Sequence, residues 1–117
     1  MADAPVKAAP TPTEAALAIA RLEAMSADVR GAVVLGPDGS ALAASGEADV
    51  WERAARELLA AADDAAGEAV THAHVGTEDG EVFAVRAGGL ALVAATERFT
   101  LASLVFADIR AVLRDLL

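Results

Sequence analysis

Few residues in this sequence have the types and spacing that chemistry requires. His72 and His74 stand two residues apart in a segment typical of a strand, so both imidazoles are expected on one face. Such a pair could begin a metal site, but the chain has no cysteine and no obvious carboxylate beside the pair. We therefore expect no metal, and we interpret the two histidines as edge-strand residues at an interface.

Motifs for catalysis or nucleotide binding are absent from the sequence. It contains neither the G-x-x-x-x-G-K-[ST] loop that cradles nucleotide phosphates nor the G-x-S-x-G elbow of a serine nucleophile. Asp63 and Asp64 end a predicted helix, where they oppose its dipole. We interpret them as a solvated face, with an acidic patch for a basic partner as the alternative. The sequence predicts no catalytic residue, no cofactor and no enzyme activity.

Charge and composition limit the partners that this chain could have. Its 117 residues include 18 acidic and 9 basic side chains, for a net charge of −9. Nucleic acids and anionic membranes attract basic surfaces, so we expect neither as a partner. The apolar runs are far shorter than the ~20 residues of a membrane helix, and no signal-peptide pattern opens the chain. These features favour a cytoplasmic protein of bacterial type without membrane insertion.

The chain is predicted to consist of a tail and one domain. Pro5, Pro10 and Pro12 predict a disordered Pro/Ala-rich tail over residues 1–12, followed by a domain over residues 13–117. Helices are expected from a Thr13 cap to Ser26, over 50–66 after an Asp49 cap, and from Thr100 to the end. Strands are expected over 29–35, 40–45, 69–76, 81–87 and 90–96.

The predicted order is α-β-β-α-β-β-β-α, with hairpins that make the strands antiparallel within each group. Ala32–Leu35 and Leu90–Ala95 are apolar at consecutive positions, which predicts central strands covered on both faces, whereas Ala69–Val75 is more polar and suits an edge. The last helix is predicted to bury one apolar stripe, formed by Leu101, Leu104, Val105, Ile109, Val112, Leu113 and Leu116.

Two stretches carry a resemblance to a known family: residues 28–45, with the Gly-Pro-Asp-Gly hairpin, and residues 92–96 leading into Leu101 and Leu104. With this element order, the chain resembles the Roadblock / dynein light-chain domain family and looks most like its prokaryotic MglB-type members. The resemblance implies an α/β protein of the α+β sandwich type. Its five-stranded antiparallel sheet would carry the first and last helices on one face and the middle helix on the other. It also implies homodimers formed through the middle helix and third strand, which act as non-catalytic platforms for small Ras-like GTPases.

The middle helix itself favours a dimer. Its apolar arc spans about 180°, whereas covering one sheet face needs only ~100°. The surplus is mostly alanine, which lets a second helix approach closely in a two-fold pair; an ordinary Ala-rich helix is the alternative. Trp51 is interpreted chiefly as a packing anchor. The predicted dimer interface consists of Trp51, Ala54, Ala55, Leu58, Ala62, Ala65, Val70, His72 and His74.

Arg53, Arg56 and Phe106 are candidate contacts with a protein partner. Both arginines also form i,i+4 pairs with Glu57 and Glu52, which we interpret as support of the helix surface rather than as an arginine finger. We expect a homodimeric interaction module that binds and regulates a small Ras-like GTPase. A small-molecule sensing domain and a structural self-assembly module without a GTPase partner are the alternatives.

Overall fold

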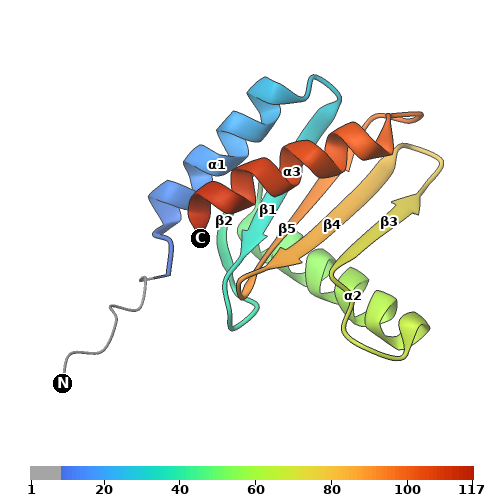
Figure 1. Ribbon diagram of the computed structural model, residues 1–117, viewed down its shortest axis with the longest axis horizontal. Coiled ribbons are helices and arrows are strands. Elements are labelled where there is room, and N and C mark those ends of the chain that lie inside the picture. The colour runs from blue at the N-terminus through green and yellow to red at the C-terminus, as the bar shows by residue number, and fades with distance from the viewer. Residues whose placement is uncertain (1–8) are drawn as a thin grey trace.

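The computed structural model describes residues 9–117 and contains three helices and five strands in the predicted order (Figure 1). The first eight residues of the predicted tail lie outside the described part. The elements are α1 (Pro12–Met25), β1 (Val29–Leu35), β2 (Ala41–Ala44), α2 (Ala48–Ala66), β3 (His72–Gly76), β4 (Glu81–Ala87), β5 (Leu90–Thr96) and α3 (Ala102–Leu116).

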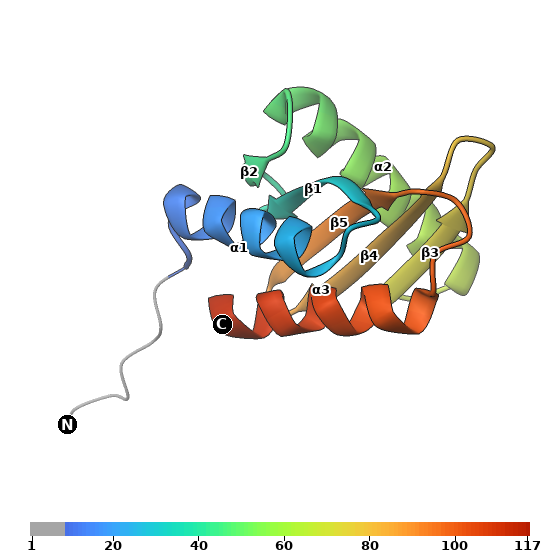
Figure 2. The same ribbon diagram turned by 90° about the horizontal axis from the view of Figure 1, so that it is seen from above.

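The strands form one antiparallel sheet in the spatial order β2-β1-β5-β4-β3. The two segments predicted to be central are β1 and β5, which pair with each other and are buried along most of their length. β3 is an edge strand, as its polar composition predicted. Figure 2 shows α1 and α3 on one side of the sheet and α2 on the other, which confirms the predicted layers.

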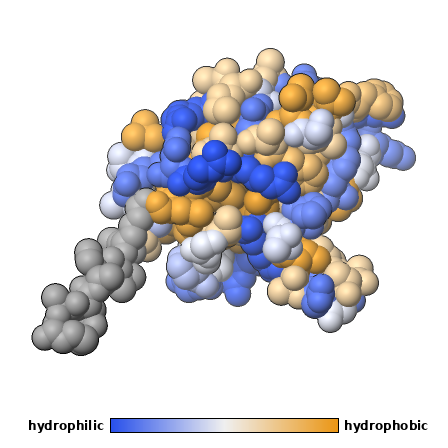
Figure 3. All heavy atoms as spheres, in the orientation of Figure 1, coloured by the Kyte–Doolittle hydropathy of each residue, from blue (hydrophilic) through white to orange (hydrophobic). Residues whose placement is uncertain are grey.

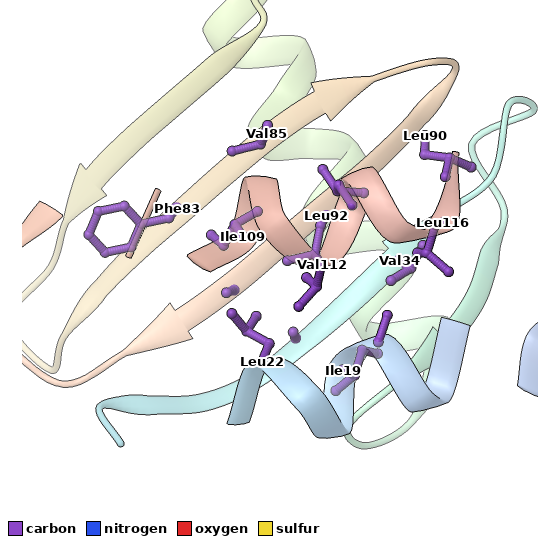
Figure 4. Close-up of a cluster of buried hydrophobic side chains, with 14 of the residues drawn as sticks. Ile19, Leu22, Val34, Phe83, Val85, Leu90, Leu92, Ile109, Val112 and Leu116 are labelled. Atoms are coloured by element: carbon purple, nitrogen blue, oxygen red, sulfur yellow. The ribbon is translucent and has the colours of Figure 1, made fainter. Parts of the chain in front are cut away.

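The main core lies between the sheet and the α1/α3 layer. Ile19 and Leu22 come from α1, and Ile109, Val112 and Leu116 come from α3; all five point toward the sheet (Figure 4). They meet a row of strand side chains that includes Val34, Phe83, Val85, Leu90 and Leu92. Arg21 of α1 bonds Asp115 of α3 outside this core.

The opposite face is covered by α2 alone. Only Ala55 and Leu59 of this helix are buried, where they meet Val33, Val93 and other sheet residues. α2 makes its close approaches to β1 and β2 rather than to β3 and β4. The far part of that face therefore carries no helix of this chain among residues 9–117.

The starts of the helices differ from the sequence prediction. Thr11, not Thr13, caps α1 through a reciprocal capping box with Glu14, and Pro12 is the first helical residue. Proline is tolerated there because the N–H that it lacks would have no helical acceptor. In the same way, Asp49 lies inside the first turn of α2, whose N-cap is Glu47, and α3 begins after Leu101 rather than at Thr100.

The predicted apolar stripe of α3 is wrong at its first two positions. Val105, Ile109, Val112, Leu113 and Leu116 are buried as expected. Leu101 and Leu104, however, are 63% and 59% exposed. Leu101 is the N-cap residue before the helix, and Leu104 lies about 100° around α3 from Val105, which packs on the core together with Ala102.

Candidate interaction surface

The outward flank of α2 is apolar. Ala54, Leu58, Ala61 and Ala65 follow one another at spacings of four, three and four residues, and Val50 precedes them by one turn. Leu58 is half-buried, whereas Val50 and the three alanines are exposed to solvent. The opposite flank is polar and carries Glu52, Arg56 and Asp63. α2 therefore presents a small-residue surface on one side only.

β3 forms one edge of the sheet, on the part that α2 does not cover, and one side of this strand is unpaired within residues 9–117. The Arg86 N–H donates to the Thr71 carbonyl at 2.8 Å, so the antiparallel alternation turns the backbone groups of His72, His74 and Gly76 away from β4. Ala73 and Val82 pack from the sheet toward the α2 side, and Val75, two residues after Ala73, points to the same side and is 39% exposed. An unpaired strand edge thus adjoins an incompletely covered apolar face.

The predicted interface residues do not all lie on one surface. Ala54, Leu58, Ala62 and Ala65 belong to the outer half of α2 or to its margin. Ala55 is only 2% exposed and packs on the protein's own sheet, so the prediction that it contributes to a dimer surface is wrong.

Trp51 is a packing residue, as predicted. It packs against the core cluster beneath α2. A Cβ placed on Gly31 would lie 2.9 Å from the Trp51 ring, and one on Gly46 would lie 3.1 Å from its indole nitrogen. Gly31 lies within β1, and its missing side chain makes room for the indole.

His72 and His74 face α3 rather than α2. The His74 ring stacks on Phe83 with centroids 4.2 Å apart, and the His72 ring meets Phe106 edge-on at 5.4 Å. Their side chains and the α2 alanines therefore lie on opposite faces of the sheet. At a β3–β3 contact, these residues would offer their backbone groups to the partner.

A carboxylate that sequence spacing did not reveal lies beside His74. Glu81 is seven residues further along, but the β3–β4 hairpin brings its Oε1 to 2.7 Å from His74 Nε2. The Thr100 hydroxyl and backbone N–H donate to its other oxygen and, with His74, lower the pKa of Glu81 below its usual range. Among residues 9–117, no three His, Asp or Glu side chains form a group able to hold a metal ion.

Asp63 is not the solvated residue that the sequence suggested. Both of its oxygens accept from the Arg86 guanidinium, at 2.7 and 3.0 Å, and one also accepts the Val70 N–H. The guanidinium, followed by that N–H, lowers the Asp63 pKa. The backbone of Val70 bonds the side chains of Asp63 and Arg86 instead of a neighbouring strand, so β3 begins at His72 and not at the predicted Ala69. Val70 of the predicted interface therefore lies in the loop before β3.

The candidate partner contacts are dispersed over three places. Arg53 is exposed on the outside of α2. Arg56 lies on the polar flank, 4.0 Å from Glu52, with its side chain beside Gly39 of the β1–β2 turn. Phe106 is half-buried against Phe83 and the two histidines, so it covers the rim of the sheet.

A cleft of about 570 Å³ opens between the polar flank of α2 and the two hairpin turns at Gly39 and Gly89. That volume is within the range of about 300–1,000 Å³ typical of small-ligand pockets. Arg86 and Asp63 line this cleft, and they are already bonded to each other.

Comparison with known proteins agrees with this architecture. No family model and no curated protein sequence matches the chain. Among solved structures, a Roadblock/LC7 domain from Streptomyces avermitilis superposes with a TM-score of 0.73 at 18% identity, covering 85% of this chain and 91% of that one. The chain therefore has the Roadblock/LC7 fold, and the resemblance found in the sequence is confirmed at this level.

Several of the similar structures are MglB proteins. MglB from Myxococcus xanthus gives a TM-score of 0.71 at 14% identity over 96% of this chain and 91% of its own. The gliding protein MglB from Thermus thermophilus gives a TM-score of 0.69 at 16% identity, with 92% of each chain covered.

The described helices include none that is both long and apolar enough to cross a membrane.

Proposed function

We propose that this protein is a cytoplasmic, homodimeric, non-catalytic module that binds a small Ras-like GTPase and biases its nucleotide state. The observation that carries the proposal is the apolar flank of α2 beside the free edge of β3, on a fold shared with MglB proteins. The sequence resemblance implies a GTPase partner. The chain itself has no phosphate-binding loop that would make it a GTPase.

The dimer is proposed to form across a two-fold axis, with α2 against α2 and β3 against β3. Alanines on the outer flank of α2 allow two helices to approach closely, and Val75 and Val82 of the sheet would be covered by the second copy. A second β3 would pair with the backbone groups of His72 and His74.

The test of the dimer is sedimentation equilibrium with Ala54→Glu. This change places a charge in the middle of the proposed helix pair, and we expect the dimer to dissociate at least about a hundredfold more readily, because an unpaired buried charge is costly. Ala60→Glu is the matched control, because Ala60 is an exposed alanine of the same helix but belongs to the other flank. Equal effects of the two variants, or a monomeric wild-type protein at ~100 μM, would contradict the proposed interface.

The test of partner binding uses a Ras-like GTPase encoded beside this gene, in GDP-bound and GTP-bound form. A non-catalytic platform shifts the GTPase between states only by the difference in its affinities for them. We therefore expect Arg53→Ala and Arg56→Ala to change single-turnover hydrolysis only as far as they change binding. A rate loss of ~10³-fold with intact binding would identify an arginine finger instead, and absence of binding in both states would exclude that GTPase.

The cleft beside Arg56 favours a second candidate, a small-molecule sensing domain. Its volume suits a ligand, and apolar walls at Leu35 and Leu59 face the Arg86–Asp63 pair. Thermal shift measurements with a metabolite library would support sensing if a compound raised the melting temperature and Ala60→Trp, which enlarges an exposed side chain of the cleft lining, removed the effect.

A further inference from the structure

An exposed phenylalanine stands on strained backbone between β5 and α3. Phe99 has a φ of 59° and is the non-glycine residue with positive φ among residues 9–117. Its side chain is 87% exposed, so no burial compensates the strain within this chain. A left-handed conformation at a bulky residue costs of order 1–3 kcal/mol and persists where the surroundings hold it, commonly at functional sites.

The segments on both sides of Phe99 are firmly held. Thr100 donates its hydroxyl and its backbone N–H to Glu81, at 2.7 and 2.8 Å. On the other side, the Glu97 N–H donates to the Asp28 carbonyl at 2.9 Å, and its carboxylate bonds the Arg30 guanidinium. The exposure of the Phe99 ring is therefore a property of an anchored loop.

Phe99 belongs to a larger apolar patch. Leu101, the N-cap of α3, and Leu104, in its first turn, are 63% and 59% exposed, and the Leu104 N–H donates to the Leu101 carbonyl. The Arg98 guanidinium lies 4.7 Å from the centre of the Phe99 ring. Figure 3 shows hydrophobic surface at this end of the α1/α3 face. Aromatic and arginine side chains that are held in place before binding are typical energetic centres of protein interfaces.

The charge around the patch specifies the partner. The strand register places the ends of β3 and β5 and the starts of β1 and β4 at this end of the sheet. Five carboxylates lie there, together with two guanidiniums, those of Arg30 and Arg98. They belong to Asp28, Glu78, Asp79, Glu81 and Glu97. Glu97 already bonds Arg30, and Glu81 bonds His74 and Thr100, so the exposed carboxylates of Asp28, Glu78 and Asp79 are the ones that face solvent without such a bond to a guanidinium. A second copy would bring the same acidic ring and be repelled, whereas a basic partner would be attracted.

We propose that Phe99, Leu101 and Leu104 form a docking site for a basic amphipathic helix of a different protein. The leucine-rich face of that helix would cover the Phe99 ring, and its lysine or arginine side chains would meet the surrounding carboxylates. The site lies on the α3 side of the sheet and is separate from the α2/β3 surface, so it does not depend on the proposed dimer or GTPase.

The test is a titration with a synthetic helical peptide of leucine and lysine, followed by amide chemical shifts and by fluorescence anisotropy of labelled peptide. We expect shifts centred on residues 98–104 and about tenfold weaker binding by Phe99→Gly and by Leu104→Ser. Leu17→Ser is the matched control, because Leu17 is 61% exposed but lies one turn before Arg21, toward the other end of α3. A leucine–glutamate peptide should not bind.

Glycine at position 99 also separates docking from folding. Glycine adopts a positive φ without strain, so Phe99→Gly should melt at the wild-type temperature or above it. A melting temperature several degrees lower would show that the ring is structural and would overturn the proposal. Undiminished peptide binding by Phe99→Gly, or shifts centred on α2, would overturn it too, as would a sedimentation experiment in which this variant loses self-association of the wild type.

Discussion

On the α1/α3 side of the sheet seventeen residues form the buried cluster, whereas on the α2 side only seven do. Two helices cross the first face, and their side chains interdigitate with those of β1, β4 and β5. A single helix covers the second face and buries just Ala55 and Leu59. Since hydrophobic stabilisation follows the apolar area that is buried, most of the folding free energy resides in the first layer.

This difference indicates that the two faces of the sheet have different roles. The α1/α3 face leaves little of its sheet exposed, so it can hold the molecule together without a partner. The α2 face keeps Val75, Val82 and the alanines of α2 in partial contact with water, which is the condition for an apolar interface with another chain. The first of the following experiments compares the two faces directly, the second compares the interior of the sheet with its free β3 edge, and the others test contacts that hold α2 in place.

The largest effect is expected from a pair of core truncations. Ile109→Ala removes a fully buried side chain from the α1/α3 layer and should lower the free energy of unfolding by about 3–5 kcal/mol. Leu59→Ala, beneath α2, should cost about 2–3 kcal/mol, because the thinner layer can relax into the space. Urea denaturation followed by circular dichroism measures both values. A larger loss for Leu59→Ala would show that the α2 layer carries more of the stability.

A second pair compares two glycines at the ends of the β3–β4 hairpin. A Cβ on Gly80 would overlap the Thr96 carbonyl oxygen, so Gly80→Ala should force the β4–β5 pairing apart and cost about 1–3 kcal/mol. Nothing lies within 4 Å of a Cβ on Gly76, which is on the free edge. Gly76→Ala should therefore be neutral or slightly stabilising. Thermal melts of the two variants measure the difference. Equal destabilisation would contradict the assignment of β3 as the free edge of the sheet.

A third comparison concerns the packing of the Trp51 ring against Gly31. Gly31→Ala would place a methyl group 2.9 Å from the indole ring and should displace the start of α2 at a cost of about 1–2 kcal/mol. Gly36→Ala is the control, because its nearest neighbour would lie at 3.5 Å, an ordinary contact. Trp51 is the sole tryptophan, so its fluorescence spectrum reports the displacement directly. An unchanged spectrum in Gly31→Ala would indicate that the indole is not held by this contact.

The smallest effect is expected on the way in which the melting temperature falls at acidic pH. The pKa of Asp63 is lowered in the folded protein by Arg86, so this group stabilises the fold above its usual value of 3.8 and loses that contribution as the pH falls through the lowered pKa. Asp63→Asn should therefore make the melting temperature fall less steeply below pH 3.8 than in the wild type. Asp64→Asn removes a carboxylate from the same turn of α2 but leaves the Arg86–Asp63 pair in place, and should alter the slope less.

Several features of the fold followed from local sequence alone. The element order and the interior positions of β1 and β5 were predictable because turn residues and apolar runs are short-range signals. The surplus apolar arc of α2 was also visible, because helical periodicity determines which residues share a flank. These signals do not require knowledge of which elements meet.

Tertiary structure decided the contacts between distant segments. Glu81 reaches both His74 and Thr100, and Asp63 reaches Arg86, because the hairpins and the sheet register bring these residues together. Likewise, Gly31 is required beside Trp51 only once α2 lies across β1. Sequence spacing could not identify these pairs, since each depends on how two elements pack.

The sequence by itself determined the order of the strands and helices and most of the buried stripe of α3, because hydrophobic periodicity and turn chemistry act within a few residues. Only the tertiary structure decided that Ala55 is core, that His72 and His74 face α3, and that Phe99, Leu101 and Leu104 stay in water. The physical reason is coverage: an apolar residue is buried only where another element extends far enough to meet it. Ala54, Ala61 and Ala65 of α2 and Leu104 of α3 point away from the sheet, where no other element of residues 9–117 covers them.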